Sequence, residues 1–196
     1  MAEAKGKRLL GFSGSPRRMG NTEVLLDEVL RGAKDAGATT EKLILADLDI
    51  APCDACMACK ESGECSITDD MEDILGKMGK SEVWVLGTPV YFWGPSAQFK
   101  LFVDRWYAKA HRTEDKAMFR GRRVILVLPM GDSDTAEARH AVGMLSDALQ
   151  YMGAEVFATV LAPDVHDPGE VRSRAEVMKA AYEAGRNAIS GGGRHA

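Results

Sequence analysis

The residues whose type and spacing most clearly suggest chemistry are four cysteines, which all lie between positions 53 and 65. Their spacing is C-x2-C-x2-C-x5-C, at Cys53, Cys56, Cys59 and Cys65. Thiolates so close in sequence can converge on one centre where the backbone is irregular. Pro52 and Gly63 favour a loop without helical structure. The spacing therefore predicts a metal or redox site on a loop over residues 52–66.

An iron–sulfur cluster is the favoured occupant, because bacterial ferredoxins use the same C-x2-C-x2-C triplet for a [4Fe–4S] cluster. The fourth thiol, Cys65, lies six residues beyond the triplet. Three alternatives stay open. A zinc site with four cysteine ligands usually has two separated pairs of cysteines. A redox dithiol at Cys53/Cys56 or Cys56/Cys59 leaves two thiols unused. Finally, four reduced thiols can simply pack at a helix junction.

A second candidate site is the polar segment Ser13–Thr22 (SGSPRRMGNT), which lies between a short apolar run and a helical pattern. Its glycines permit close backbone approach, and its hydroxyl, amide and guanidinium groups can donate to an anion. The following helix N-terminus adds free N–H groups. The alternative is a polar turn capped by Asn21 or Thr22. The candidate phosphate-binding residues are Ser13, Ser15, Arg17 (or Arg18), Gly20, Asn21 and Thr22.

A third candidate site is Gly87–Pro95 (GTPVYFWGP), which places three consecutive aromatic residues in a segment stiffened by two prolines. Loops run over the surface, so bulky apolar side chains there need something to cover them. A planar heterocycle would do so, whereas a core cap or a dimer contact is the alternative. Gly94 permits a sharp turn. The candidate ring-binding residues are Pro89, Val90, Tyr91, Phe92, Trp93 and Gly94.

Five nearly continuous apolar runs of strand length must position these segments. Such runs are typical of parallel strands covered on both faces. Ligands of an open parallel sheet bind beyond the carboxyl ends of its strands, where both candidate loops lie. The predicted strands are Arg8–Ser13, Lys42–Ala46, Val83–Gly87, Val124–Pro129 and Glu155–Leu161.

Helical patterns separate these runs, and the alternation predicts an α/β fold with a doubly wound, five-stranded parallel sheet and helices on both faces. We expect one domain over residues 1–189, with the cysteine loop inserted after the second strand and a flexible tail at 190–196. Asp69 and Glu72 are spaced as helix caps rather than catalysts. The predicted helices are Thr22–Gly37, a helix starting in Thr68–Asp73, Ala97–Ala110, Thr135–Met152 and Pro168–Ala188.

Composition excludes several classes of protein. The chain has 196 residues, 45% of them hydrophobic, and a formal net charge of −4. These values argue against disorder, and against nucleic-acid or membrane binding by bulk attraction. The start has no signal-peptide pattern, and the longest apolar stretch, 83–93, is too short to span a bilayer. We expect a cytoplasmic protein, in which disulfides are disfavoured.

Taken together, the phosphate loop and the aromatic loop suit a mononucleotide with a flat ring. Ser13–Thr22, Thr88–Gly94 and Lys100 with Asp104–Arg105 resemble the flavodoxin-like, NAD(P)H-dependent FMN reductase family over residues 7–165. The four cysteines resemble the iron–sulfur flavoprotein branch of that family, which carries a [4Fe–4S] cluster beside FMN. The resemblance also implies that Pro129–Asp134 lies near the far edge of the flavin ring.

The resemblance implies an oxidoreductase that takes electrons from NAD(P)H or a reduced carrier. FMN, and a cluster where present, would pass them to a quinone, aromatic or protein acceptor. FMN is favoured over FAD because only one phosphate-sized loop is visible. No acid–base residue is assigned, since the cofactor does the difficult chemistry. The alternatives are an electron carrier without turnover and a non-catalytic module. The aromatic surface predicts a homodimer or tetramer.

Overall fold

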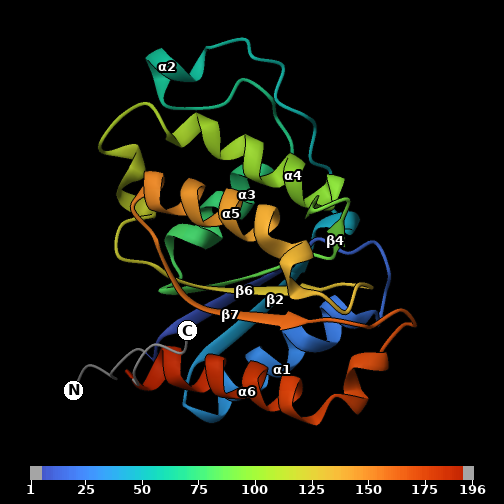
Figure 1. The fold of residues 1–196 in the computed structure, drawn as a ribbon. Coiled ribbons are helices and arrows are strands. Elements are labelled where there is room, and N and C mark those ends of the chain that lie inside the picture. Colours follow the sequence, from blue (N-terminus) through green and yellow to red (C-terminus); the bar gives the residue numbers. More distant parts are fainter. Residues whose placement is uncertain (1–5, 192–196) are drawn as a thin grey trace, which may run out of the picture.

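The computed structural model describes residues 6–191, and a parallel sheet forms its centre (Figure 1). The strand order is β2-β1-β3-β6-β7, and every neighbouring pair is parallel. This order, with its reversal beside the first strand, is that of flavodoxin-like doubly wound folds, so the predicted fold class is confirmed. The strands are β1 (Arg8–Ser13), β2 (Thr39–Ile44), β3 (Val83–Gly87), β6 (Arg123–Pro129) and β7 (Glu155–Ala162).

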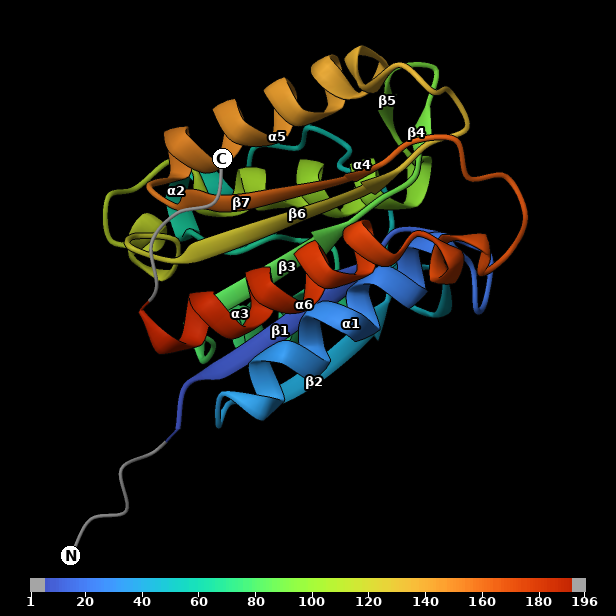
Figure 2. The same ribbon diagram turned by 60° about the horizontal axis from the view of Figure 1, so that its bottom comes forward.

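Helices cover both faces of the sheet, which explains the continuous apolar runs. One layer is α1 (Asn21–Asp35) with α6 (Ala175–Ser190). The other contains α3 (Met71–Gly79), α4 (Ala97–Asp104) and α5 (Arg139–Met152) (Figure 2). Because all of β3 is buried, its five residues have no solvent-facing side that would require alternation.

The two helices of the first layer pack backbone against backbone. A Cβ atom built on Gly32 would lie 2.0 Å from the carbonyl oxygen of Tyr182. A Cβ on Gly185 would lie 1.9 Å from the carbonyl oxygen of Val29. Only glycine fits at these two positions, so these two residues set how closely α1 and α6 approach.

Several element boundaries differ from the predictions. The second strand, predicted at Lys42–Ala46, is Thr39–Ile44, followed by the 3-10 turn Leu45–Asp47. This strand is at the sheet edge and half-exposed, so its polar first residues hide it from a search for apolar runs. The predicted helix Ala97–Ala110 is α helical only to Asp104 and continues as a 3-10 helix over Arg105–Lys109.

Short 3-10 segments also change the other predicted helices. Thr135–Ala138 precedes α5, and Glu170–Ser173 precedes α6. Helix α6 includes Ser190, the first residue of the predicted tail, and residues 192–196 of that tail lie outside the described residues. A further 3-10 helix lies at Asp115–Met118.

Two features of the loops were not predicted. The aromatic loop is a small antiparallel hairpin of β4 (Val90–Tyr91) and β5 (Gly94–Pro95). The cysteine loop, predicted as non-helical, contains one helical turn, α2 (Cys59–Ser62), and lies outside α4, away from the sheet (Figure 1). Among residues 6–191, no helix combines the length and apolar character needed to cross a membrane.

Candidate functional site

A cleft of about 320 Å³ opens at the carboxyl edge of the sheet. It lies at the place where the strand order reverses, which is where open α/β sheets bind ligands. Loops that follow four different strands contribute to it. Its lining residues are Ser15, Arg17, Asn21, Thr22, Pro89, Val90, Tyr91, Pro129, Met130, Gly131, Val165 and His166.

The structure brings seven of the twelve predicted cofactor-binding residues into this cleft, namely Ser15, Arg17, Asn21, Thr22, Pro89, Val90 and Tyr91. Ser13 and Gly20 do not line it, and the Ser13 hydroxyl is buried without a hydrogen-bond partner. Phe92, Trp93 and Gly94 line a separate, open hollow beside Arg139 and His140. The predicted flat-ring wall is therefore divided between two surfaces.

The N-terminus of α1 points its first N–H groups at the phosphate loop without a capping side chain. The N-cap residue is Gly20, whose neighbours Asn21 and Thr22 begin the helix. The alternative of a turn capped by Asn21 or Thr22 is therefore not what this structure has. Uncapped N–H groups at the start of a 15-residue helix favour a bound anion.

The side chain of Asn21, which lines the cleft, also bonds to the segment after β7. Its amide Nδ2 donates to the carbonyl of Asp167 at 3.0 Å, and its Oδ1 accepts from the N–H of Val171 at 3.1 Å. Arg17 also donates to the carbonyl of His166, at 3.1 Å. These bonds attach the segment after β7 to the phosphate loop and explain how Val165 and His166 reach the cleft.

Sequence reasoning did not select Val165 and His166, although the rule that located the other loops applies to them. They follow β7, and every loop after a strand of a parallel sheet leaves at the same edge. The loop after β6 reaches the cleft through Pro129, Met130 and Gly131. The next residues, 132–134, do not line the cleft, and Asp134 accepts from Ala136 N and caps the following 3-10 helix.

The tip of the aromatic hairpin, Phe92 and Trp93, has a strained backbone and exposed side chains. Phe92 and Trp93 have φ values of 49° and 63°, a left-handed region that large side chains rarely occupy. Gly94, where the sequence permits a sharp turn, is not in this region. Phe92 is 93% exposed. Two consecutive left-handed residues form the tight turn that a two-residue hairpin needs.

Buried polar contacts fix the aromatic hairpin against the phosphate loop. The Ser96 hydroxyl donates to the carbonyl of Gly14 at 2.6 Å and accepts from Phe99 N at 3.2 Å, capping α4. The Ser96 N–H donates to the Thr88 hydroxyl at 3.0 Å. A Cβ on Gly14 would lie 2.7 Å from Phe99, so the loop needs glycine there. The buried Ser96 hydroxyl therefore joins the two loops that form the walls of the cleft, together with the bond from Gly14 N to the carbonyl of Gly87 at 2.7 Å.

All four cysteines line a second, small cavity, which we call the cysteine cavity. Cys59 is buried, Cys65 is half-buried, and Cys53 and Cys56 are exposed. Burial raises the pKa of the Cys59 thiol, and the three neighbouring thiols raise it further. Within residues 6–191 all four thiols are free, and no three ligands stand at metal-binding distances. The donor set suits a thiolate-bound centre, although the loop is not closed around one.

A buried ion pair holds both ends of the cysteine loop. Arg105, which is 2% exposed, forms a bidentate pair with Asp69, whose side chain is 3% exposed. Arg105 also donates to the carbonyl of Ala51 at 2.9 Å, before the loop, and to the Cys65 sulfur at 3.4 Å. The loop is thereby attached to the 3-10 helix that follows α4.

The Asp69 carboxylate also accepts hydrogen bonds from backbone N–H groups on either side of the cysteine loop. Its oxygens accept from the N–H of Ala51 and of Met71, both at 3.0 Å. Burial raises the pKa of Asp69, but these bonds and Arg105 lower it, and the net pKa is below its usual value. Asp69 thus accepts from the first N–H of α3, but the predicted Asp69–Glu72 capping pair is not formed, because the N-cap residue is Asp70 and its side chain makes no capping bond.

Comparison with known proteins identifies related sequences. Residues 7–166 match the sequence profile of the NADPH-dependent FMN reductases. An iron–sulfur flavoprotein of Methanocaldococcus jannaschii is 47% identical over 98 residues, which are 50% of this chain and 51% of that protein. An iron–sulfur flavoprotein of Methanosarcina thermophila is 37% identical over 98 residues, 50% of this chain and 51% of that protein. These matches thus span about half the length of either relative.

The fold has close structural counterparts. An NAD(P)H:quinone oxidoreductase from Methanothermobacter marburgensis superimposes with a TM-score of 0.72 and 19% sequence identity, over 93% of this chain and 96% of that one. At this identity the likeness concerns the fold.

The ion pair yields the first prediction. Asp69→Asn leaves Arg105 buried without a countercharge and should lower the free energy of unfolding by about 3–5 kcal/mol. Urea unfolding at pH 7 measures this change.

The same pair makes the stability depend on pH. Because the pKa of Asp69 is lowered on folding, its contribution to the free energy of unfolding is present above the ordinary carboxyl pKa and is lost as pH falls below about 4.

The control is the double variant Asp69→Asn/Arg105→Met, which removes both charges. It should be more stable than Asp69→Asn alone, because no unpaired charge stays buried. The single variant Arg105→Met completes the cycle. If the double variant loses as much free energy of unfolding as the two single variants together, the two residues do not interact.

Proposed function

The chain belongs to the NADPH-dependent FMN reductase family, and on that basis we propose that it is an oxidoreductase that binds FMN in the cleft and oxidises NADPH or NADH. The observation that carries this proposal is the cleft itself, where Ser15, Arg17 and Thr22 face Pro89–Tyr91 across one opening. An anion-binding wall and a stiff apolar wall are what a flavin mononucleotide requires.

The residues of the phosphate loop suit the FMN phosphate. The uncapped N–H groups of α1 and the Ser15 and Thr22 hydroxyls would donate to it, and the Arg17 guanidinium would add positive charge. The nearest buried carboxylate, Glu23, does not oppose this, because it is bound by Lys42 at 2.8 Å and by Met19 N at 2.7 Å. The single loop suits FMN rather than FAD.

The flavin ring would lie against Pro89, Val90 and Tyr91, in a cleft that Met130 and Gly131 also line. Bound FMN supplies the chemistry: it can accept a hydride and release electrons singly or in pairs. The chain's own residues orient the ring and exclude water from one face. We assign no side chain as a general acid or base.

We also propose that Cys53, Cys56, Cys59 and Cys65 hold a [4Fe–4S] cluster. Three observations support this: the four thiols line one cavity, their spacing matches a known cluster triplet, and the similar proteins described above are called iron–sulfur flavoproteins. The cluster would supply one-electron transfer. Such thiols suit a reducing compartment such as the cytoplasm.

The proposed electron acceptor is a quinone, an aromatic compound or a redox protein. The second candidate function is a flavodoxin-like electron carrier without turnover of its own. The two differ in one assay, because only the reductase oxidises NADPH or NADH catalytically when an acceptor is present.

The second prediction tests the flavin site. Thr22→Val keeps the side-chain shape but removes the hydroxyl, and Ser15→Ala removes the other. Each should weaken FMN binding about ten- to hundredfold, since hydrogen bonds to charged groups contribute about 1.5–3 kcal/mol. Fluorescence titration of the flavin-free chain measures the affinity. Thr39→Ala, at the opposite edge of the sheet, is the control. Unchanged affinity in both site variants would contradict this placement of the phosphate.

The third prediction concerns the cluster. Protein purified without oxygen should contain roughly four iron and four sulfide ions per chain. Cys59→Ser should lose most of them, whereas Ser66→Ala, which removes a hydroxyl 3.0 Å from the Cys56 sulfur, should keep them. Stoichiometric zinc, or four titratable thiols with no metal, would reject the cluster.

The fourth prediction concerns assembly. We propose that the exposed aromatic tip, Phe92 with Trp93, contacts a second copy of the chain in a homodimer or tetramer. Sedimentation of the FMN-bound protein should show a multiple of 21.2 kDa. Phe92→Ser should weaken association at least about tenfold, while Tyr151→Ser, at an exposed aromatic elsewhere, should not. A wild-type monomer at micromolar concentration would exclude this contact.

A further inference from the structure

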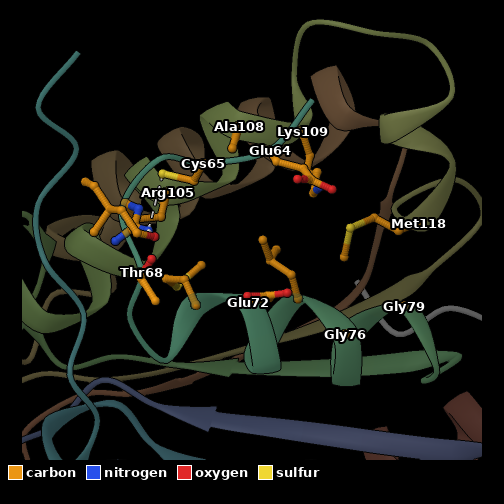
Figure 3. Close-up of a pocket in the computed structure, with 13 residues that line it drawn as sticks. Glu64, Cys65, Thr68, Glu72, Gly76, Gly79, Arg105, Ala108, Lys109 and Met118 are labelled. Carbon is orange, nitrogen blue, oxygen red and sulfur yellow. Dashed lines mark hydrogen bonds between the residues drawn. The ribbon is translucent and has the colours of Figure 1, made fainter. Parts of the chain in front are cut away.

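A cavity of about 380 Å³ lies between α3 and the 3-10 helix after α4, away from the flavin cleft (Figure 3). We call it the α3 cavity. Its floor is α3, its roof is the segment Arg105–Lys109, and the end of the cysteine loop closes one side. None of its lining residues lines the cleft at the carboxyl edge. The volume is within the range of small-molecule sites.

Glycines keep the floor of this cavity open. Gly76 and Gly79 both line it, and a Cβ atom on either would meet no other atom within 4 Å. Gly32 and Gly185 are helical glycines that the close contact of α1 with α6 requires. No such contact requires glycine at position 76, although glycine destabilises a helix interior. The missing side chains therefore leave space that the chain itself does not fill.

The walls favour an apolar aromatic ligand. Ile67, Met71, Leu75 and Ala108 contribute apolar surface, and Met118 projects into the space from the far end (Figure 3). Two methionines at one cavity are suited to flat rings, because thioether sulfur makes favourable contacts with aromatic edges.

The charges around the cavity disfavour an anion. Arg105 is neutralised by Asp69, so it offers no free positive charge. The remaining charged residues are Glu64 and Glu72, against the single cation Lys109, which already donates to the carbonyl of Gly63 at 2.9 Å. These charges exclude a negatively charged ligand, and the apolar walls favour a neutral one of one or two rings over a hydrated cation, with a hydroxyl or carbonyl group at its edge.

The α3 cavity shares a wall with the cysteine cavity. Cys65, Arg105 and Ala108 line both. Figure 3 shows Cys65 at the upper edge, joined to Arg105 by the 3.4 Å hydrogen bond. We propose that the α3 cavity binds a neutral aromatic molecule of one or two rings in contact with Cys65. This site is separate from the flavin cleft and does not depend on the proposed function.

The test uses the full chain, with and without added FMN, and two matched probes at pH 7, neutral 2-naphthol and the anion 2-naphthoate. Isothermal titration should give saturable 2-naphthol binding at about millimolar concentration or tighter, and binding of 2-naphthoate at least about tenfold weaker. Methyl NMR locates the site: the signals of Met71 and Met118 should shift, whereas Met130 in the flavin cleft should not.

Variants complete the test. Gly76→Leu fills the cavity and should weaken 2-naphthol binding at least about tenfold. Gly143→Leu is the matched control, since Gly143 is a glycine within α5 that also has no atom within 4 Å of an added Cβ, and it should bind normally. Gly76→Ala is a smaller change that favours the helix, and it replaces Gly76→Leu if that variant does not fold. Its affinity for 2-naphthol should lie between those of the wild type and Gly76→Leu.

Three results would overturn the proposal. The first is no saturable binding of 2-naphthol, or binding that shifts Met130 instead of Met118. The second is equal affinity in wild type, Gly76→Ala and Gly76→Leu. The third is a change in sedimentation on Gly76→Leu without probe binding, which would assign this surface to a second copy of the chain.

Discussion

Burial of the parallel sheet on both faces is the constraint on which the rest of the structure depends. Once helices cover both faces, the central strands β1, β3 and β6 have no solvent-facing side, and their polar residues lie at the strand ends. The carboxyl ends all point to one edge. Segments that are more than 140 residues apart in sequence, such as Arg17 and His166, are therefore in direct contact there.

Helix α4 connects the two candidate sites. At its N-terminus, Ser96 caps the helix and holds the aromatic hairpin against the phosphate loop. Directly after its C-terminus, Arg105 holds the cysteine loop through Asp69. Eight helical residues span about 12 Å. The two sites are thus fixed relative to each other by a single rigid element rather than by a flexible loop.

The Arg105–Asp69 pair also explains why a loop with little core of its own keeps a defined position. The cysteine segment contributes only Cys59 to the buried apolar residues, so hydrophobic packing cannot hold it. A buried ion pair is a costly substitute, because both charges lose their hydration. Here each partner makes further hydrogen bonds to the backbone on either side of the loop, which offsets that loss. Arg105 of this pair lines both the cysteine cavity and the α3 cavity.

The sequence alone determined the fold class, because local apolar runs and helical periods are properties of neighbouring residues. Arg8–Ser13 and Val83–Gly87 were predicted to the residue, since polar residues or the Gly87-Thr88-Pro89 turn signal mark their ends. The edge strand β2 was misplaced, because a half-exposed strand does not need a continuous apolar run. Ser15, Arg17, Asn21 and Thr22, and Pro89–Tyr91, were selected in the same way, from residue types that directly follow a strand, and the structure places them in one cleft.

The tertiary structure decided what depends on contacts between distant residues. It used the amide of Asn21 to hold the segment after β7, and it brought Val165 and His166 into the cleft. It placed Phe92 and Trp93 in the strained turn of the hairpin, where they line a separate hollow outside the cleft. It also opened a cavity over Gly76, which no periodicity could indicate. A local pattern specifies which way one side chain faces; it does not specify which remote backbone or side chain meets it, because that depends on how the layers pack.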